Sequence, residues 1–124
     1  MGDVNHHAKI SEENMRGAIE ELKNERFTNV GLLSLRALEQ MIEACAAKEG
    51  LHFHEHPKTA HVNRRNWLKT HHPDLVEMWD ELWGIYGALG YGGLNGDRAK
   101  EAVRVLKRAL TELSGREKIG IKGL

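Results

Sequence analysis

The sequence contains little that would support thiol or membrane chemistry. Cys45 is its single cysteine, so one chain can form neither an internal disulfide nor a zinc site made of several thiolates. Cys45 lies in the apolar stretch Ala-Cys-Ala-Ala, which predicts a buried core residue rather than a nucleophile. No run approaches the roughly 20 apolar residues of a membrane-spanning helix, and the N-terminus lacks the apolar stretch of a secretory signal. These absences predict a cytoplasmic protein with no membrane partner.

Net charge is lacking as well. Lysine plus arginine and aspartate plus glutamate both number 18, so the formal charge is zero with the histidines neutral. This balance excludes a global positive field that would hold nucleic acid without sequence preference, and any such binding must come from a local patch. Eight histidines add positive charge only in mild acid.

Strand signals are nearly absent, and apolar residues recur instead at helical spacing. The 124 residues suffice for one domain with one core. We predict an all-α fold, an up-and-down helical bundle of four to five helices, with a core at about residues 11–113 and a frayed basic tail at 114–124. The first expected helix begins after the N-cap Ser11, and the second runs from about Thr28 to Glu49 before a C-cap at Gly50. The other three are expected from about Thr59 to Thr70, from Pro73 to the glycines after Tyr86, and from Asn95 or Asp97 to Leu113.

Two of these segments carry unusually broad apolar stripes, around residues 30–45 and 75–89. A stripe this broad indicates contacts on two sides of a helix, as in a central bundle helix or one shared with a second subunit. Because one short chain offers few elements to cover both stripes, we expect a homodimer.

A histidine-rich loop is the first candidate for chemistry. His52, His54 and His56 alternate in sequence, and neutral imidazole is a common ligand for zinc, copper and nickel. Alternate side chains point the same way only in an extended loop, and no helical metal motif such as His-Glu-x-x-His occurs on a predicted helix. The sequence leaves two interpretations open, a metal site and a solvated polar loop with one or two histidines capping helices.

The segment from Arg64 to His72 is the second candidate. On a helix, Arg65 shares a face with Lys69 and His72, and an arginine can clamp a phosphate while His71 or His72 moves a proton to or from a ribose hydroxyl. A solvated helix face docked by a tryptophan explains the same residues. The residues predicted to bind a ligand here and nearby are Arg64, Lys69, His61 and Tyr91.

Aromatic side chains gather on the segment after Pro73. Trp79 and Trp83 are four residues apart, as are Leu82 and Tyr86, so they line one side of a helix. Such a stripe predicts core or subunit interface, because a shelf for a nucleobase would need an exposed ring. The glycines that follow contain no phosphate-loop pattern.

Several short motifs between Ser11 and Leu113 together resemble the HEPN family, whose name stands for higher eukaryotes and prokaryotes nucleotide-binding. The resemblance implies a small up-and-down helical bundle that is generally dimeric. The motifs are Glu39-Gln40-Met41-Ile42-Glu43-Ala44 on a long second helix, the Gly50 stop, the Pro57 loop, Thr59-Ala60-His61 entering the next helix, and Tyr86-Gly87-Ala88-Leu89-Gly90-Tyr91.

The resemblance implies one of two roles. Many HEPN proteins are metal-independent endoribonucleases whose active site pairs an arginine with a histidine four to six residues later, whereas others lack nuclease activity and pair with a small nucleotidyltransferase. Arg65 with His71 or His72 matches this spacing, but it lies earlier than the family's motif, and residues 86–96 hold no histidine. We therefore expect a dimeric nucleotide- or RNA-associated module of the toxin–antitoxin kind, without a cofactor, beside a nucleotidyltransferase. The alternatives are the endoribonuclease and the histidine-loop metal binder.

Overall fold

The computed structural model describes residues 3–92 and 95–124 and confirms the all-α class. Within those ranges there is no strand, and no helix is both long enough and apolar enough to cross a membrane. The elements are α1 (Val4–Lys23), α2 (Phe27–Ala47), the 3₁₀ helix η1 (Phe53–Glu55), α3 (Pro57–His71), the 3₁₀ helix η2 (Pro73–Leu75), α4 (Val76–Gly92) and α5 (Gly96–Glu117).

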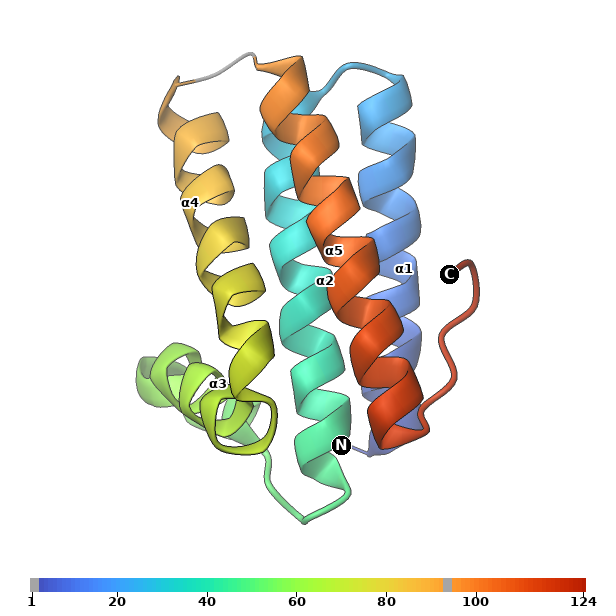
Figure 1. Ribbon diagram of the computed structural model, residues 1–124, viewed down its shortest axis with the longest axis vertical. Helices are drawn as coiled ribbons and strands as arrows, with labels where there is room; N and C mark the ends of the chain where they lie inside the picture. The colour runs from blue at the N-terminus through green and yellow to red at the C-terminus, as the bar shows by residue number, and fades with distance from the viewer. Residues whose placement is uncertain (1–2, 93–94) are drawn as a thin grey trace.

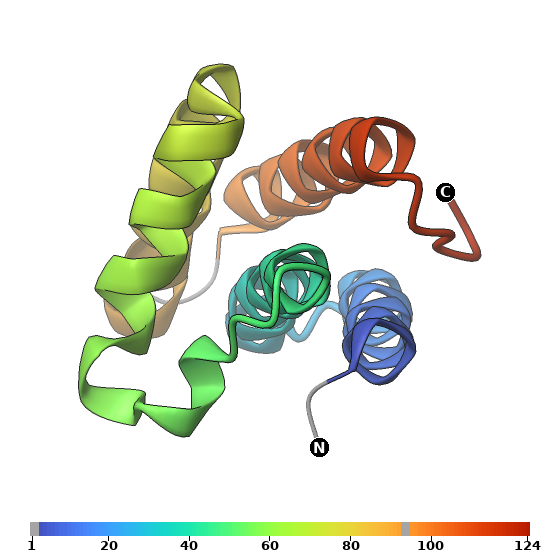
Figure 2. The same ribbon diagram turned by 90° about the horizontal axis from the view of Figure 1, so that it is seen from below.

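Four helices form the bundle, and α3 runs crosswise to them at one end, beside α4. Figure 1 shows α1, α2, α4 and α5 running along the long axis in alternating directions, with α2 in the middle. Seen from below in Figure 2, α3 lies across the end where α2 finishes and α4 begins. Helix α2 packs against α1, α4, α5 and α3, which makes it the central element of the fold.

The central position of α2 explains its broad apolar stripe. Val30, Ala37, Met41 and Ile42 are all 0% exposed within a single chain. On α4, Trp83 and Tyr86 are half-buried, but Trp79 is also 0% exposed and Leu82 is 1% exposed. A second subunit is therefore not needed to bury most of these residues, and the stripes no longer argue for a dimer.

The first helix begins earlier than the sequence indicated. We predicted Ser11 as its N-cap, but α1 starts at Val4, and the side chain of Asp3 accepts a hydrogen bond of 2.6 Å from the backbone N–H of His6. Ser11 lies in the middle of the helix with 0% exposure, where its hydroxyl donates to the Ala37 carbonyl at 2.7 Å. A serine can cap a helix or bind a neighbouring backbone, and here tertiary packing decides between the two.

Other local predictions are confirmed. Gly50 follows α2 with a φ of 77°, the left-handed conformation that glycine adopts without strain. The side chain of Asn95 caps α5 by accepting from the backbone N–H of Arg98 at 3.1 Å. Cys45 is fully buried, and burial raises the pKa of its thiol to about 12, so it is no nucleophile at neutral pH.

The C-terminal segment is packed rather than frayed. Helix α5 continues to Glu117, and Ser114 donates from its hydroxyl to the Ile119 carbonyl at 2.6 Å. Ile119 is only 6% exposed, and the backbone N–H of Lys122 donates to a carboxylate oxygen of Glu12 on α1 at 2.9 Å. Figure 1 shows this segment turning back beside α1.

Helices α2 and α4 approach each other closely at Gly31. A Cβ built on this buried glycine would lie 3.2 Å from Leu89 Cδ1 and 3.4 Å from Tyr86 Cα. The absence of a side chain therefore sets how near the backbone of α4 comes to α2 at this level.

Replacing Ile119 with alanine tests the packed C-terminus. The substitution removes a buried side chain from the core, and we expect it to lower the free energy of unfolding by about 2 kcal/mol or more in urea denaturation. The matched control is Leu124→Ala, because Leu124 is 47% exposed and should change stability little. Equal and negligible effects of the two substitutions would contradict the packed arrangement.

Candidate functional site

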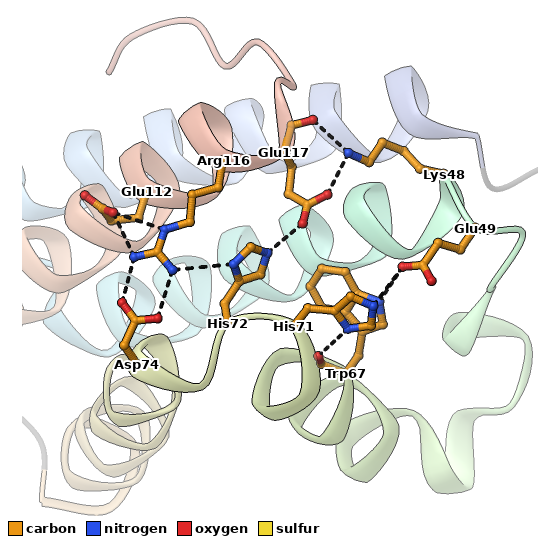
Figure 3. A network of polar contacts seen from close by, with 9 residues as sticks. All are labelled: Lys48, Glu49, Trp67, His71, His72, Asp74, Glu112, Arg116 and Glu117. Atoms are coloured by element: carbon orange, nitrogen blue, oxygen red, sulfur yellow. Dashed lines mark hydrogen bonds and ion pairs between the residues drawn. The ribbon is translucent and has the colours of Figure 1, made fainter.

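The two histidines predicted to carry a proton belong to a polar network that joins the α3–α4 junction to α2 and α5 (Figure 3). His72 is 9% exposed, with Nε2 2.6 Å from Glu117 Oε2 and Nδ1 3.4 Å from Arg116 Nη1. A guanidinium only donates, so Nδ1 of His72 accepts while its Nε2–H donates to Glu117. With both nitrogens engaged by protein groups, His72 is arranged as a structural link rather than a proton carrier.

The rest of this network is made of ion pairs. Lys48 Nζ lies 2.6 Å from Glu117 Oε1, and Arg116 binds both carboxylate oxygens of Asp74 at 2.8 and 2.6 Å. Burial acts to raise the pKa of Glu117, but hydrogen bonds from Lys48 and His72 outweigh it and the pKa is lowered. The hydrogen bonds from Arg116 lower the pKa of Asp74 to about 2. The network therefore braces the end of α5 against its neighbours.

Arg65 is not brought together with either histidine. Its guanidinium forms a two-pronged pair with Asp80 on α4, with both distances 2.9 Å. His71 instead stacks on Trp67 at a ring separation of 4.3 Å, and its Nε2 lies 3.1 Å from Glu49 Oε1 at the end of α2. Each predicted catalytic side chain thus has a different carboxylate partner from a different part of the chain, and within one chain Arg65 is paired with neither histidine.

The residues predicted to bind a ligand are also spread out. Lys69 is exposed on α3, and His61 packs against α4, with its ring 4.3 Å from that of Trp83. Tyr91 is 95% exposed in the last turn of α4, at the far end of the bundle from α3 (Figure 1). Arg64, by contrast, lines the groove described below.

A buried charged cluster surrounds Glu43 on α2. Glu43 is 0% exposed, and Arg64 Nε donates to its Oε2 at 2.7 Å. Its Oε1 accepts from the backbone N–H of His54 at 3.3 Å and lies 3.1 Å from His54 Nδ1. Burial acts to raise the pKa of Glu43, but these hydrogen bonds prevail and lower it. Glu39, one turn earlier, pairs with Arg64 at 3.4 Å, and there burial prevails and raises the pKa.

His7 completes this cluster from α1. It is 3% exposed, its Nδ1 lies 2.7 Å from Gln40 Oε1, and its ring centroid is 4.8 Å from that of His54. Nε2 of His7 is buried without a hydrogen-bond partner among the described residues. Burial lowers the pKa of His7, which keeps the ring neutral at pH 7.

The cluster differs from the predicted histidine loop. Only His54 of the three loop histidines joins it; His52 lies beside it, with ring centroids 5.9 Å apart, and His56 is exposed. Sequence spacing missed His7 and Glu43 because they come from other helices. The available signals were a histidine pair at the chain start and a carboxylate on the apolar stripe of α2.

A groove of about 360 Å³ opens beside the cluster, between α2, the start of α3 and α4. Its wall combines arginine with aromatic rings, and Trp83 and Tyr86 meet edge to face at 5.6 Å. Arg36 is 61% exposed and lies 3.9 Å from Glu39. The lining residues are Leu32, Leu35, Arg36, Glu39, Gln40, His54, Pro57, Ala60, Arg64, Trp83 and Tyr86.

A second groove, of about 500 Å³, lies between α5 and the segment formed by η2 and α4. Its lining includes four carboxylates and three basic side chains but no aromatic ring. Arg116, one of these bases, is already paired with Asp74 and Glu112. The groove beside Glu43 therefore has the more suitable chemistry for a ligand.

Comparison of the chain with protein family models, curated proteins and solved structures found no match.

Removing the Glu117 carboxylate should change how stability depends on pH. Because the pKa of Glu117 is lowered in the folded state, its ionised carboxylate stabilises the protein at pH values above the ordinary pKa of 4.5. This stabilisation is lost as the pH falls through the lowered pKa. We expect Glu117→Gln to cost about 1 kcal/mol at pH 7 and its difference from the unmodified protein to shrink in acid. Urea denaturation at a series of pH values from 7 down into acid measures this difference in stability. The control is Glu13→Gln, because Glu13 is exposed. A difference that stays constant with pH would contradict the assignment.

Proposed function

We propose that the protein binds a nucleotide, or one nucleotide unit of an RNA, in the groove between α2, α3 and α4. The observation that carries this proposal is that two guanidinium groups, of Arg36 and Arg64, and two aromatic side chains, of Trp83 and Tyr86, line the same groove. Guanidinium groups match phosphate oxygens, and aromatic rings stack on bases. The groove volume falls within the usual range for small-molecule sites, about 300–1,000 Å³.

The two arginines have different parts in this proposal. Arg64 is held by Glu39 and Glu43 with a side chain 12% exposed, so it presents a fixed guanidinium. Arg36 is exposed, with a long contact of 3.9 Å to Glu39, so it can turn toward a bound phosphate.

The resemblance to the HEPN family extends the proposal to a homodimer that works beside a small nucleotidyltransferase. This role agrees with the separation of Arg65 from His71 and His72, because a partnered module does not need that catalytic pair. The dimer itself is supported by the resemblance alone, since one chain covers most of the apolar stripes of α2 and α4.

Arg36→Ala tests the groove. Its matched control is Arg104→Ala, because both arginines are exposed on helices and pair with a glutamate three residues away. We expect Arg36→Ala to weaken ATP binding in calorimetry at least about tenfold, since a hydrogen bond to a charged group contributes about 1.5–3 kcal/mol, and Arg104→Ala to leave it unchanged. Adenosine should bind more weakly than ATP. No ATP binding, or equal effects of the two substitutions, would contradict the proposal.

Sedimentation equilibrium at micromolar concentration tests the dimer. We expect a mass of two chains of 14.0 kDa each. A single-chain mass across the concentration range would remove the homodimer while leaving the groove proposal standing, because every lining residue comes from one chain.

A further inference from the structure

Three potential metal ligands converge from separate elements at the buried cluster. His7 of α1, Glu43 of α2 and His54 of η1 each offer one ligand atom, and these atoms all lie within 4.8 Å of one another. Two imidazoles and a carboxylate form a ligand set that zinc takes in proteins. His7 and Glu43 are buried, so they do not gather merely as solvated surface groups.

The orientation of His7 is the strongest indication. An amide oxygen only accepts, so the hydrogen bond to Gln40 Oε1 places the ring hydrogen of His7 on Nδ1. Nε2 then presents a lone pair, and this atom is buried without a partner in the described ranges. Histidines that bind metals are held in this way, with the far ring nitrogen donating to an oriented oxygen. A buried acceptor left without a partner is unfavourable, and a metal ion would satisfy it.

The spacing suits a tetrahedral ion after a small adjustment. Two ligand atoms bound to one zinc ion at about 2.0–2.1 Å lie roughly 3.4 Å apart. Glu43 Oε1 and His54 Nδ1 are 3.1 Å apart, close to this separation. An ion bound between them would replace the hydrogen that Nδ1 donates to Glu43, and the ring hydrogen of His54 would move to Nε2. The widest separation in the set, up to 4.8 Å, requires a shift of about 1 Å in a ring.

The charge of Glu43 and the opening of the cluster to the groove also suit a cation. Arg64 engages Oε2 of Glu43 and leaves Oε1 directed at His54, the side from which an ion would be held. His54 has a side chain 31% exposed, and it lines the open groove together with Gln40. The groove therefore gives an ion a route to the cluster.

We propose that His7, Glu43 and His54 bind one divalent transition-metal ion of the zinc class, with Gln40 orienting His7. This site borders the proposed nucleotide groove, because His54 and Gln40 also line it, but its three ligands differ from the arginine and aromatic residues proposed to hold the nucleotide. His52, whose Nδ1 is buried without a partner in the described part of the chain, stands beside the site as a further nitrogen donor.

Calorimetry with Zn²⁺ alone on chelator-treated full-length protein tests the site. We expect one ion per chain, and we expect binding to weaken more than 100-fold in His54→Ala and about 10–100-fold in Gln40→Leu, which removes an orienting group. The control is His56→Ala, because His56 belongs to the same loop but is exposed and should leave the affinity unchanged. Bound Co²⁺ should give the intense visible absorption of a tetrahedral site with nitrogen and oxygen ligands.

Three results would overturn the proposal: no Zn²⁺ binding by the unmodified protein, full affinity in His54→Ala, or an equal loss in His56→Ala. If His7→Ala fails to fold, the half-buried His54 still carries the test, with circular dichroism to verify its helices. ATP titration of the metal-free unmodified protein and of Arg36→Ala separates the two proposals, because both proteins keep every metal ligand and a failed metal site leaves Arg36-dependent ATP binding in place.

Discussion

The carboxylate of Glu43 has no access to solvent, so its charge must be compensated inside the protein. Arg64 from α3 and His54 from η1 supply this compensation, and both segments are thereby held against α2. Removing one partner from a buried ion pair typically costs about 3–5 kcal/mol, a large part of the roughly 5–15 kcal/mol that stabilises a whole domain. The crosswise position of α3, the groove beside it and the cluster of His7 and His54 around Glu43 therefore all depend on one buried charge.

Much of the fold could be predicted because local signals agree with the final structure. Helical periodicity identified the five helices, prolines and glycines marked their connections, and Asn95 acts as the cap that its position indicated. The start of α1 was misplaced because Ser11 has a capping side chain and a buried tertiary partner, and the sequence does not show which prevails. The tail was misjudged because a single apolar residue such as Ile119 is too short a pattern to reveal packing.

The site could be predicted only in part. Periodicity says which side of a helix is apolar but not which other segment covers it, so the broad stripe of α2 indicated a partner subunit where further helices of the same chain suffice. Spacing along α3 placed Arg65 near His72, yet ion pairs with Asp80 and Glu117 hold them against different helices. The meeting of His7 with His54 joins segments far apart in sequence and leaves no local pattern.

Gly31 influences the width of the groove although it does not line it. The backbone of α4 rests against α2 at this glycine, where a methyl group would meet Leu89 and the main chain of Tyr86 at 3.2 and 3.4 Å. A larger residue at position 31 would act as a spacer that pushes Tyr86 outward, while the ion pairs of Glu43 keep the opposite wall in place. The width of the groove, and with it the size of molecule admitted, can thus be altered from within the α2–α4 interface without changing any residue that a ligand touches.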